Sequence, residues 1–201
     1  MSADVVIVDA GGANTGSVRY AIERLGFDAE LTTDAATIRA AARVVLPGVG
    51  TASMVMRRLR GLDLVETLRA LRQPLLGICV GMQVLFERSR EGDVECLGLL
   101  SGDVERLPAR ADARVPHIGW SRVRPVRGST LLDSGDEGAF AYFVHSFAAA
   151  PTPDCVASCE HASPFAAAVE RGNIAGVQFH PERSGAFGAR VLRRFIEGAA
   201  T

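Results

Sequence analysis

The first 80 residues alternate short apolar runs with segments of helical periodicity, and this alternation constrains the fold more than any other feature. Residues 5–8 read Val-Val-Ile-Val, a β-branched run typical of a strand buried on both faces of a parallel sheet. Residues 17–25 carry apolar side chains at helical spacing and end at a glycine, which predicts a helix. Such alternation favours βαβ units, in which helices cover both faces of a mostly parallel sheet.

The remaining elements extend this pattern and then change it. Further strands are expected at 29–31, 43–46 and 75–78. One helix is expected to start near Thr33 or Asp34, and another to run over 52–71. The second half has strand-like segments separated by turn residues, at 113–118, 139–147, 155–160, 165–170 and 174–179, and a last helix at 187–195. We therefore expect one α/β domain over residues 1–201, an open, mostly parallel sheet with antiparallel additions in its C-terminal half.

Composition excludes several classes of protein. The 201 residues are 48% hydrophobic with a net charge of −1, which suits a globular core and offers no excess of cations for nucleic acid or anionic lipid. No apolar stretch reaches the roughly 18 residues of a membrane span and no secretory leader is recognisable, so a cytoplasmic location is expected. Four cysteines in a chain of this length predict reduced thiols rather than a disulfide framework.

A cysteine flanked by glycines stands where a predicted strand meets a predicted helix. Residues 77–81 read GICVG, and a helical pattern with apolar Met82, Leu85 and Phe86 follows. A sharp strand-to-helix turn exposes a nucleophile above the sheet, and partial positive charge at a helix N-terminus favours the thiolate. The pattern alone also fits an inert buried cysteine, but its position makes Cys79 the candidate nucleophile.

A histidine and a glutamate near the C-terminus complete a candidate triad. His180 ends an apolar strand-like run, and Glu182 follows two residues later. In an extended chain these positions face the same side, so the carboxylate can orient the imidazole and stabilise its protonated form. His-Pro-Glu alone is usually a surface turn, but with an elbow cysteine upstream the order predicts a Cys79-His180-Glu182 triad.

A glycine-rich loop after the predicted strand at 43–46 can supply an oxyanion hole. Residues 47–50 read PGVG, and acyl transfer needs backbone N–H groups aimed at the developing oxyanion. We assign this role to the N–H of Val80, which follows the nucleophile, and to that of Gly50. Without the elbow, the same residues would be interpreted as a plain Pro-Gly turn.

Longer motifs connect these candidates to a known family. The segments are PGVG at 47–50, GICVGMQ at 77–83, LGL at 97–99, VPHIGW at 115–120, YFVHS at 142–146 and VQFHPE at 177–182. Together they resemble the class I glutamine amidotransferases, and more narrowly the glutaminase subunits of imidazole glycerol phosphate synthase in histidine biosynthesis. The narrower resemblance depends on VPHIGW and YFVHS, which other amidotransferases lack.

The resemblance implies roles that the residues alone do not establish. It implies that Gln83, His145 and Ser146 help to hold the α-amino and carboxylate groups of glutamine. It also places Trp120 and Tyr142 toward a partner, a (β/α)8-barrel cyclase that forms a heterodimer with this chain and uses the released ammonia. The cyclase makes imidazole glycerol phosphate and an aminoimidazole carboxamide ribotide. No cofactor and no metal are expected.

Three positions depart from the usual pattern of the family. Ser121 stands where Asn is usual, Phe147 where Tyr is common and Arg183 where Lys is common. Arg183 keeps its charge, whereas Ser121 shortens a polar side chain beside the expected interface. None of the three belongs to the triad.

Alternatives of other kinds remain at this point. Cys155, Cys159 and His161 could suggest a metal site, but the spacing lacks a nearby fourth ligand and lies in strand-like sequence. His117 fits a structural role as well as a functional one. The chain could also serve another assembly such as pyridoxal phosphate synthase, be another cysteine hydrolase of related fold, or be a catalytically silent binding subunit.

Overall fold

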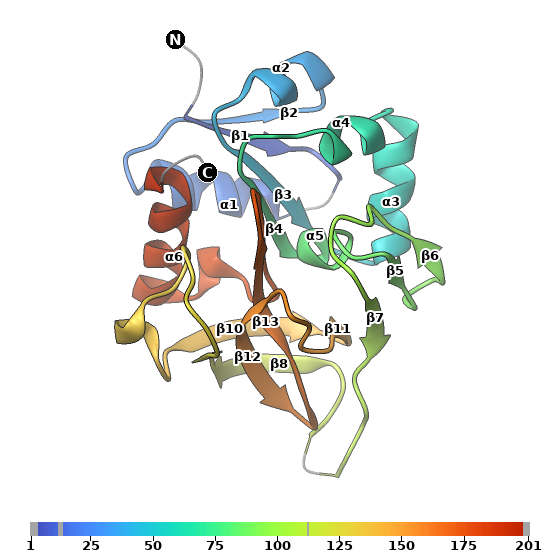
Figure 1. Cartoon of the computed structure of the whole chain (residues 1–201), viewed down its shortest axis with the longest axis vertical. Coiled ribbons are helices and arrows are strands. Elements are labelled where there is room, and N and C mark those ends of the chain that lie inside the picture. Colours follow the sequence, from blue (N-terminus) through green and yellow to red (C-terminus); the bar gives the residue numbers. More distant parts are fainter. Residues whose placement is uncertain (1–3, 12–13, 112, 199–201) are drawn as a thin grey trace.

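A central sheet of eight strands organises the molecule (Figure 1). The structure is a computed structural model that describes residues 4–11, 14–111 and 113–198. The sheet has the order β2-β1-β3-β4-β14-β13-β12-β9. The first five strands in this order are parallel, and β13, β12 and β9 add to them antiparallel. Their bounds are Val5–Val8 (β1), Ala29–Thr32 (β2), Val44–Gly48 (β3), Leu75–Cys79 (β4), Arg124–Pro125 (β9), Cys155–His161 (β12), Ser163–Arg171 (β13) and Ile174–Val177 (β14).

Helices cover both faces of this sheet. Figure 1 shows α1 (Thr15–Glu23) and α6 (Gly185–Glu197) on one side, and α3 (Ala52–Gly61) with α5 (Val80–Gln83) on the other. The remaining helices are α2 (Ala35–Ala40), α4 (Val65–Arg69) and the short 3-10 helices η1 (Ser134–Asp136) and η2 (Pro181–Arg183). The expected fold class, an α/β domain with a mostly parallel sheet and antiparallel additions, is confirmed.

Two smaller sheets lie beside the main one. The strands β8 (His117–Arg122) and β10 (Phe140–His145) form an antiparallel pair. The other sheet has the order β11-β7-β5-β6, with bounds Phe147–Ala149 (β11), Asp103–Arg106 (β7), Arg88–Ser89 (β5) and Val94–Glu95 (β6). Strands of two residues are too short for periodicity to predict, which is why β5 and β6 were not expected.

The helix predicted over 52–71 and the strand predicted at 113–118 were wrong in their extent. The single helix over 52–71 is broken into α3 and α4, because the chain turns at Asp63, which adopts a positive φ of 54°. The strand predicted at 113–118 begins only at His117, since Pro116 has no N–H to donate to a ladder.

Among the described residues, none of the helices combines the length and apolarity that crossing a membrane requires.

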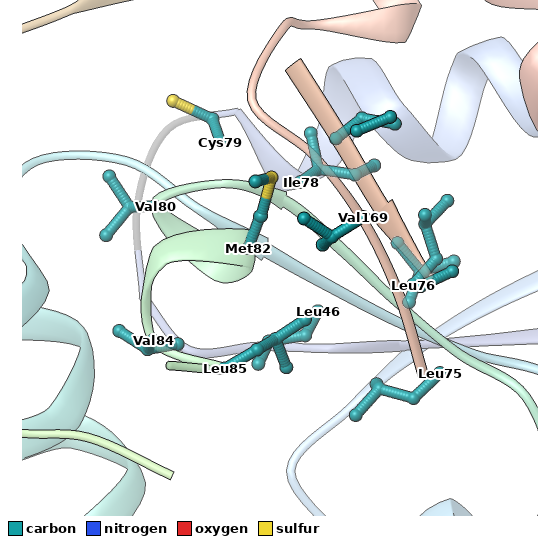
Figure 2. Packing of buried hydrophobic residues seen from close by; sticks show 14 of the residues in the cluster. Leu46, Leu75, Leu76, Ile78, Cys79, Val80, Met82, Val84, Leu85 and Val169 are labelled. Carbon is teal, nitrogen blue, oxygen red and sulfur yellow. The ribbon is translucent and has the colours of Figure 1, made fainter. Parts of the chain in front are cut away.

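The buried core places the candidate nucleophile at the carboxyl end of β4. Leu46, Leu75 and Leu76 are fully buried in the neighbouring parallel strands β3 and β4. Figure 2 shows the Cys79 sulfur pointing away from the leucine side chains. Ligand sites of open α/β sheets lie outside the carboxyl ends of the strands, so a functional site is expected at this edge.

Candidate active site

The backbone at Cys79 is strained, as a nucleophile elbow requires. Its φ of 55° and ψ of −112° lie outside the regions that side-chain-bearing residues usually adopt, a strain of roughly 1–3 kcal/mol. A Cβ on Gly81 would overlap the carbonyl oxygen of Leu46, and one on Gly77 would lie 2.7 Å from the backbone of Met82. The glycines are therefore needed because β3, β4 and α5 approach so closely. The following helix is shorter than predicted, since α5 ends at Gln83.

The structure brings Cys79, His180 and Glu182 together. His180 Nδ1 lies 2.8 Å from Glu182 Oε1, and the Glu182 side chain is 1% exposed. The reason expected for this contact was wrong, because β14 ends at Val177 and Glu182 belongs to the 3-10 helix η2. His180 Nε2 is buried without a hydrogen-bond partner among the described residues.

The electrostatics of this group favour an imidazolium beside a carboxylate. Burial disfavours the charged ring, but interactions with Cys79 and Glu182 outweigh burial and raise the pKa of His180 to about 10. No Nε2–Sγ contact meets hydrogen-bond geometry, so we attribute the effect of Cys79 to charge. Burial raises the pKa of Glu182, yet its contacts with His180 and Asn14 dominate and lower it. His180 is therefore poised to hold a proton near neutral pH.

The side-chain amides of Gln83 and Gln178 form a hydrogen-bonded chain that ends at the Cys79 sulfur. Gln178 Nε2 lies 3.8 Å from Cys79 Sγ, and Gln178 Oε1 accepts from Gln83 Nε2 at 3.1 Å. Gln83 Nε2 also donates to the Phe147 carbonyl at 2.7 Å. These oxygens fix both amide orientations, so that Gln178 must present its N–H to the sulfur. Gln83 thus reaches Cys79 through Gln178 and does not line the pocket described below.

A second hydrogen-bonded chain runs through buried histidines to the same carbonyl. His145 Nδ1 donates to the Phe147 carbonyl at 2.9 Å, so its Nε2 accepts from His117 Nδ1 at 3.2 Å. His117 Nε2 must then accept from the Ser121 hydroxyl at 2.9 Å. Burial lowers the pKa of His117 to about 4 and that of His145 to about 3, which keeps both rings neutral. Ser121 therefore retains a defined hydrogen bond, and His117 is a satisfied buried residue.

A pocket of about 450 Å³ opens above the cysteine. The predicted site residues that line it are Gly50, Cys79, Val80, His145, Ser146 and His180. Gly50 has a φ of +86°, a conformation that glycine adopts without strain. The loop after β3 and the elbow thus lie on the same pocket, as an oxyanion hole requires.

Sequence reasoning missed three residues around this pocket. Gln178 is fully buried and contacts the sulfur, and it lies within the VQFHPE motif itself. Glu91 and Asn14 both line the pocket, but no motif in the sequence links either of them to the triad. Burial raises the pKa of Glu91, although the Ala52 N–H, 3.2 Å from its carboxylate, opposes this.

The alternative metal site is not supported. His161 Nε2 donates to the Arg114 carbonyl at 2.7 Å, and the ring stacks on His117 with centroids 4.1 Å apart. Within the part of the chain that the structure describes, no group of three or more His, Cys, Asp or Glu side chains could hold a metal ion. Burial raises the pKa of Cys159 to about 11, as it does that of Cys96, so both behave as inert buried thiols.

Comparison with known sequences defines the class of protein. The sequence profile described as "Glutamine amidotransferase class-I" matches residues 6–199, and the chain belongs to this family. It is 57% identical to "Imidazole glycerol phosphate synthase subunit HisH" of Xanthomonas axonopodis pv. citri (strain 306), over 96% of this chain and 97% of that protein. The protein of the same name from Xylella fastidiosa (strain Temecula1 / ATCC 700964) is 55% identical with the same coverage. The resemblance inferred from the sequence motifs is confirmed.

Solved structures agree on the fold. A putative GMP synthase protein from Thermoplasma acidophilum matches with a TM-score of 0.74 at 21% identity, covering 96% of this chain and 92% of that one. The glutaminase domain of Trypanosoma brucei CTPS, solved with bound acivicin, matches with a TM-score of 0.66 at 15% identity, covering 96% and 93%. At such low identity these likenesses establish the architecture only.

Proposed function

We propose that this chain is the glutamine amidotransferase component of an imidazole glycerol phosphate synthase in histidine biosynthesis. Residues 1–201 form one glutaminase domain, which hydrolyses glutamine and delivers ammonia to a partner. The observation that carries the proposal is the strained Cys79 beside the buried His180-Glu182 pair, at a pocket of about 450 Å³. The full-length likeness to the HisH subunits supports the choice of assembly.

The chemistry follows from the positions of the three triad residues. The Cys79 thiolate attacks the carboxamide carbon of glutamine, and His180 gives its proton to the departing ammonia. His180 then takes a proton from water, which hydrolyses the glutamyl thioester to glutamate. Glu182 orients the imidazole and stabilises its charged form throughout.

The rest of the pocket suits the ends of a glutamine molecule. The N–H groups of Val80 and Gly50 are assigned to the oxyanion, as donors that act on charge developing in the transition state. Glu91 supplies a carboxylate for the α-ammonium group, and His145 and Ser146 also line the pocket and are assigned to the carboxylate end of glutamine. Gln83 does not contact glutamine in this proposal and acts by orienting Gln178 toward the Cys79 sulfur.

An exposed apolar face beside the pocket is the proposed docking surface for the partner. This docking face consists of the exposed Ile118, Trp120, Phe140 and Val144 and the partly exposed Tyr142, all on the paired strands β8 and β10. Trp120 is 54% exposed and Ile118 61%, and contiguous apolar exposure of this kind marks an interaction site. Val144 also lines the pocket, so ammonia released there is produced at the edge of the interface.

The partner in this proposal is a (β/α)8-barrel cyclase that forms a heterodimer with the chain. It uses the ammonia to make imidazole glycerol phosphate and an aminoimidazole carboxamide ribotide. We place the pair in the cytoplasm, where the four cysteines, all unpaired in the structure, would stay reduced. Glycine at position 50 permits more than one backbone conformation, which gives the partner a means of control, because an oxyanion donor that points away leaves the glutaminase nearly silent.

Covalent labelling tests the nucleophile directly. The chain is incubated, alone and with the cyclase, with a diazo-ketone analogue of glutamine, and the adduct is located by peptide mass spectrometry. We expect one adduct, on Cys79, that glutamine prevents, together with release of glutamate from glutamine itself. Cys96 is an internal control, since burial raises its pKa to about 11. A chain that neither reacts nor releases glutamate would be a silent binding subunit.

A further inference from the structure

Asn14 lies at the start of α1 but does not cap it. Asparagine is among the preferred N-cap residues because its side-chain oxygen can accept from the first turn of a helix. In this chain the Asn14 side chain makes no such bond, although the residue occupies the N-cap position of α1. The side-chain amide of Asn14 is therefore free to bind a group outside α1.

The amide of Asn14 is bound to the carboxylate of the proposed triad. Asn14 Nδ2 donates to Glu182 Oε1 at 2.6 Å, across 168 positions of sequence. The same oxygen accepts the hydrogen bond of His180 Nδ1 at 2.8 Å. Asn14 Nδ2 also lies 3.3 Å from His180 Nδ1, but two donors cannot bond to each other, so this distance only records their convergence on one oxygen.

The location of Glu182 makes this second donor important. Its side chain is 1% exposed, and its other oxygen, Oε2, is buried without a hydrogen-bond partner among the described residues. A buried carboxylate needs donors to remain ionised and to keep one orientation. The contact with Asn14 is one of the interactions that lower the pKa of Glu182. A rotation of Glu182 would also release the imidazole of His180.

We propose that Asn14 is a positioning residue that fixes the Glu182 carboxylate, and through it the His180 ring, for glutamine hydrolysis. The side chain acts as a neutral donor, since an amide can share the charge of the carboxylate without competing for its proton. This inference rests on the proposed triad. It extends the Cys-His-Glu arrangement to a fourth side chain contributed by the connection between β1 and α1.

The test compares Asn14→Asp with the wild type, each assembled with the cyclase. Aspartate has the shape of asparagine, and the Asn14 side chain makes no cap bond that the change could remove, so α1 is retained while the donor is lost. Near pH 8 we expect kcat for glutamine hydrolysis to fall roughly 10-fold or more, with KM changed less than about twofold. Two adjacent carboxylates raise the pKa of one of them, so the introduced carboxyl group, once protonated in acid, donates again. The loss relative to wild type should therefore shrink as the pH is lowered.

A double-mutant cycle distinguishes this role from a structural one. Glu182→Ala is combined with Asn14→Asp, and the second change should cost no further activity if Asn14 acts only through Glu182. A full additional loss in the Glu182→Ala background, or a change confined to KM, would overturn the proposal. Normal turnover of Glu182→Ala alone would be a different failure, because it would remove the triad on which the inference rests.

Discussion

The elbow at Cys79 and the docking face on β8 and β10 differ in how tightly their residues are packed. At the elbow, β3, β4 and α5 pack so tightly that their glycines have no space for a side chain. On β8 and β10, large apolar side chains such as Trp120 remain exposed. Tight packing holds the strained backbone of Cys79 in place, whereas contiguous exposed apolar area marks a surface that a partner covers. The elbow is therefore complete in the isolated chain, whereas the docking face is covered only in an assembly.

Closing the space at the elbow should have the largest effect. A Cβ in Gly81→Ala would overlap the Leu46 carbonyl oxygen, so β3 and α5 must separate. We expect a loss of more than about 4 kcal/mol in the free energy of unfolding, measured by denaturant titration. Gly61→Ala is the control, because nothing lies within 4 Å of the added atom and the change should be neutral or stabilising by up to about 1 kcal/mol. Similar stability of the two variants would contradict the packing argument.

The tight region was the easier one to predict from sequence. Gly-x-Cys-x-Gly at a strand end reports a backbone geometry that few other residues allow, and the triad residues lie in motifs of their own. Gln178 and Asn14 were missed because their roles depend on which side-chain amides meet in space, and periodicity carries no such information. The break at Asp63 was missed because it depends on a single residue with a positive φ.

On the docking face, removing one large side chain should weaken assembly without unfolding the chain. Trp120→Ala is expected to weaken binding to the cyclase about 30-fold, a loss of about 2 kcal/mol, measured by calorimetry. Its contact with Tyr142, at 6.0 Å between ring centroids, contributes at most about 1 kcal/mol to folding. Tyr20→Ala on α1 removes an aromatic ring that is 62% exposed and should leave binding unchanged. Equal loss in both variants would mean that the face is not the interface.

At the triad, removing the sulfur should lower the pKa of His180. That pKa is raised to about 10, and Cys79 is one of the groups that raise it. In Cys79→Ala we expect the histidine titration, followed by NMR, to move down by about one to three pH units. A raised pKa stabilises the folded protein below the unfolded value of about 6.5, and this stabilisation is lost as the pH rises through the folded value. The variant should lose this stabilisation at a lower pH than the wild type. An unchanged histidine titration would show that the sulfur does not influence the pKa of His180.

Beneath the docking face, the Ser121 hydroxyl should have the smallest effect of the series. Ser121→Ala removes the donor to His117 Nε2 and leaves this buried acceptor unpaired at the end of the chain that holds His145. Since His145 lines the pocket, we expect KM for glutamine to rise by a factor of about 2–10, as one neutral hydrogen bond would allow. Ser121→Asn, which restores a donor, should recover most of the loss. An unchanged KM in Ser121→Ala would show that this chain of histidines does not influence the pocket.

The division between the two regions is tested most directly by Cys79→Ala assembled with the cyclase. Formation of imidazole glycerol phosphate is measured with glutamine and, separately, with an ammonium salt as the nitrogen source. We expect the glutamine-dependent reaction to disappear while the ammonium-dependent reaction keeps its wild-type rate, because the acceptor chemistry belongs to the partner. Loss of both reactions, or a glutamine-dependent rate that survives, would contradict this division.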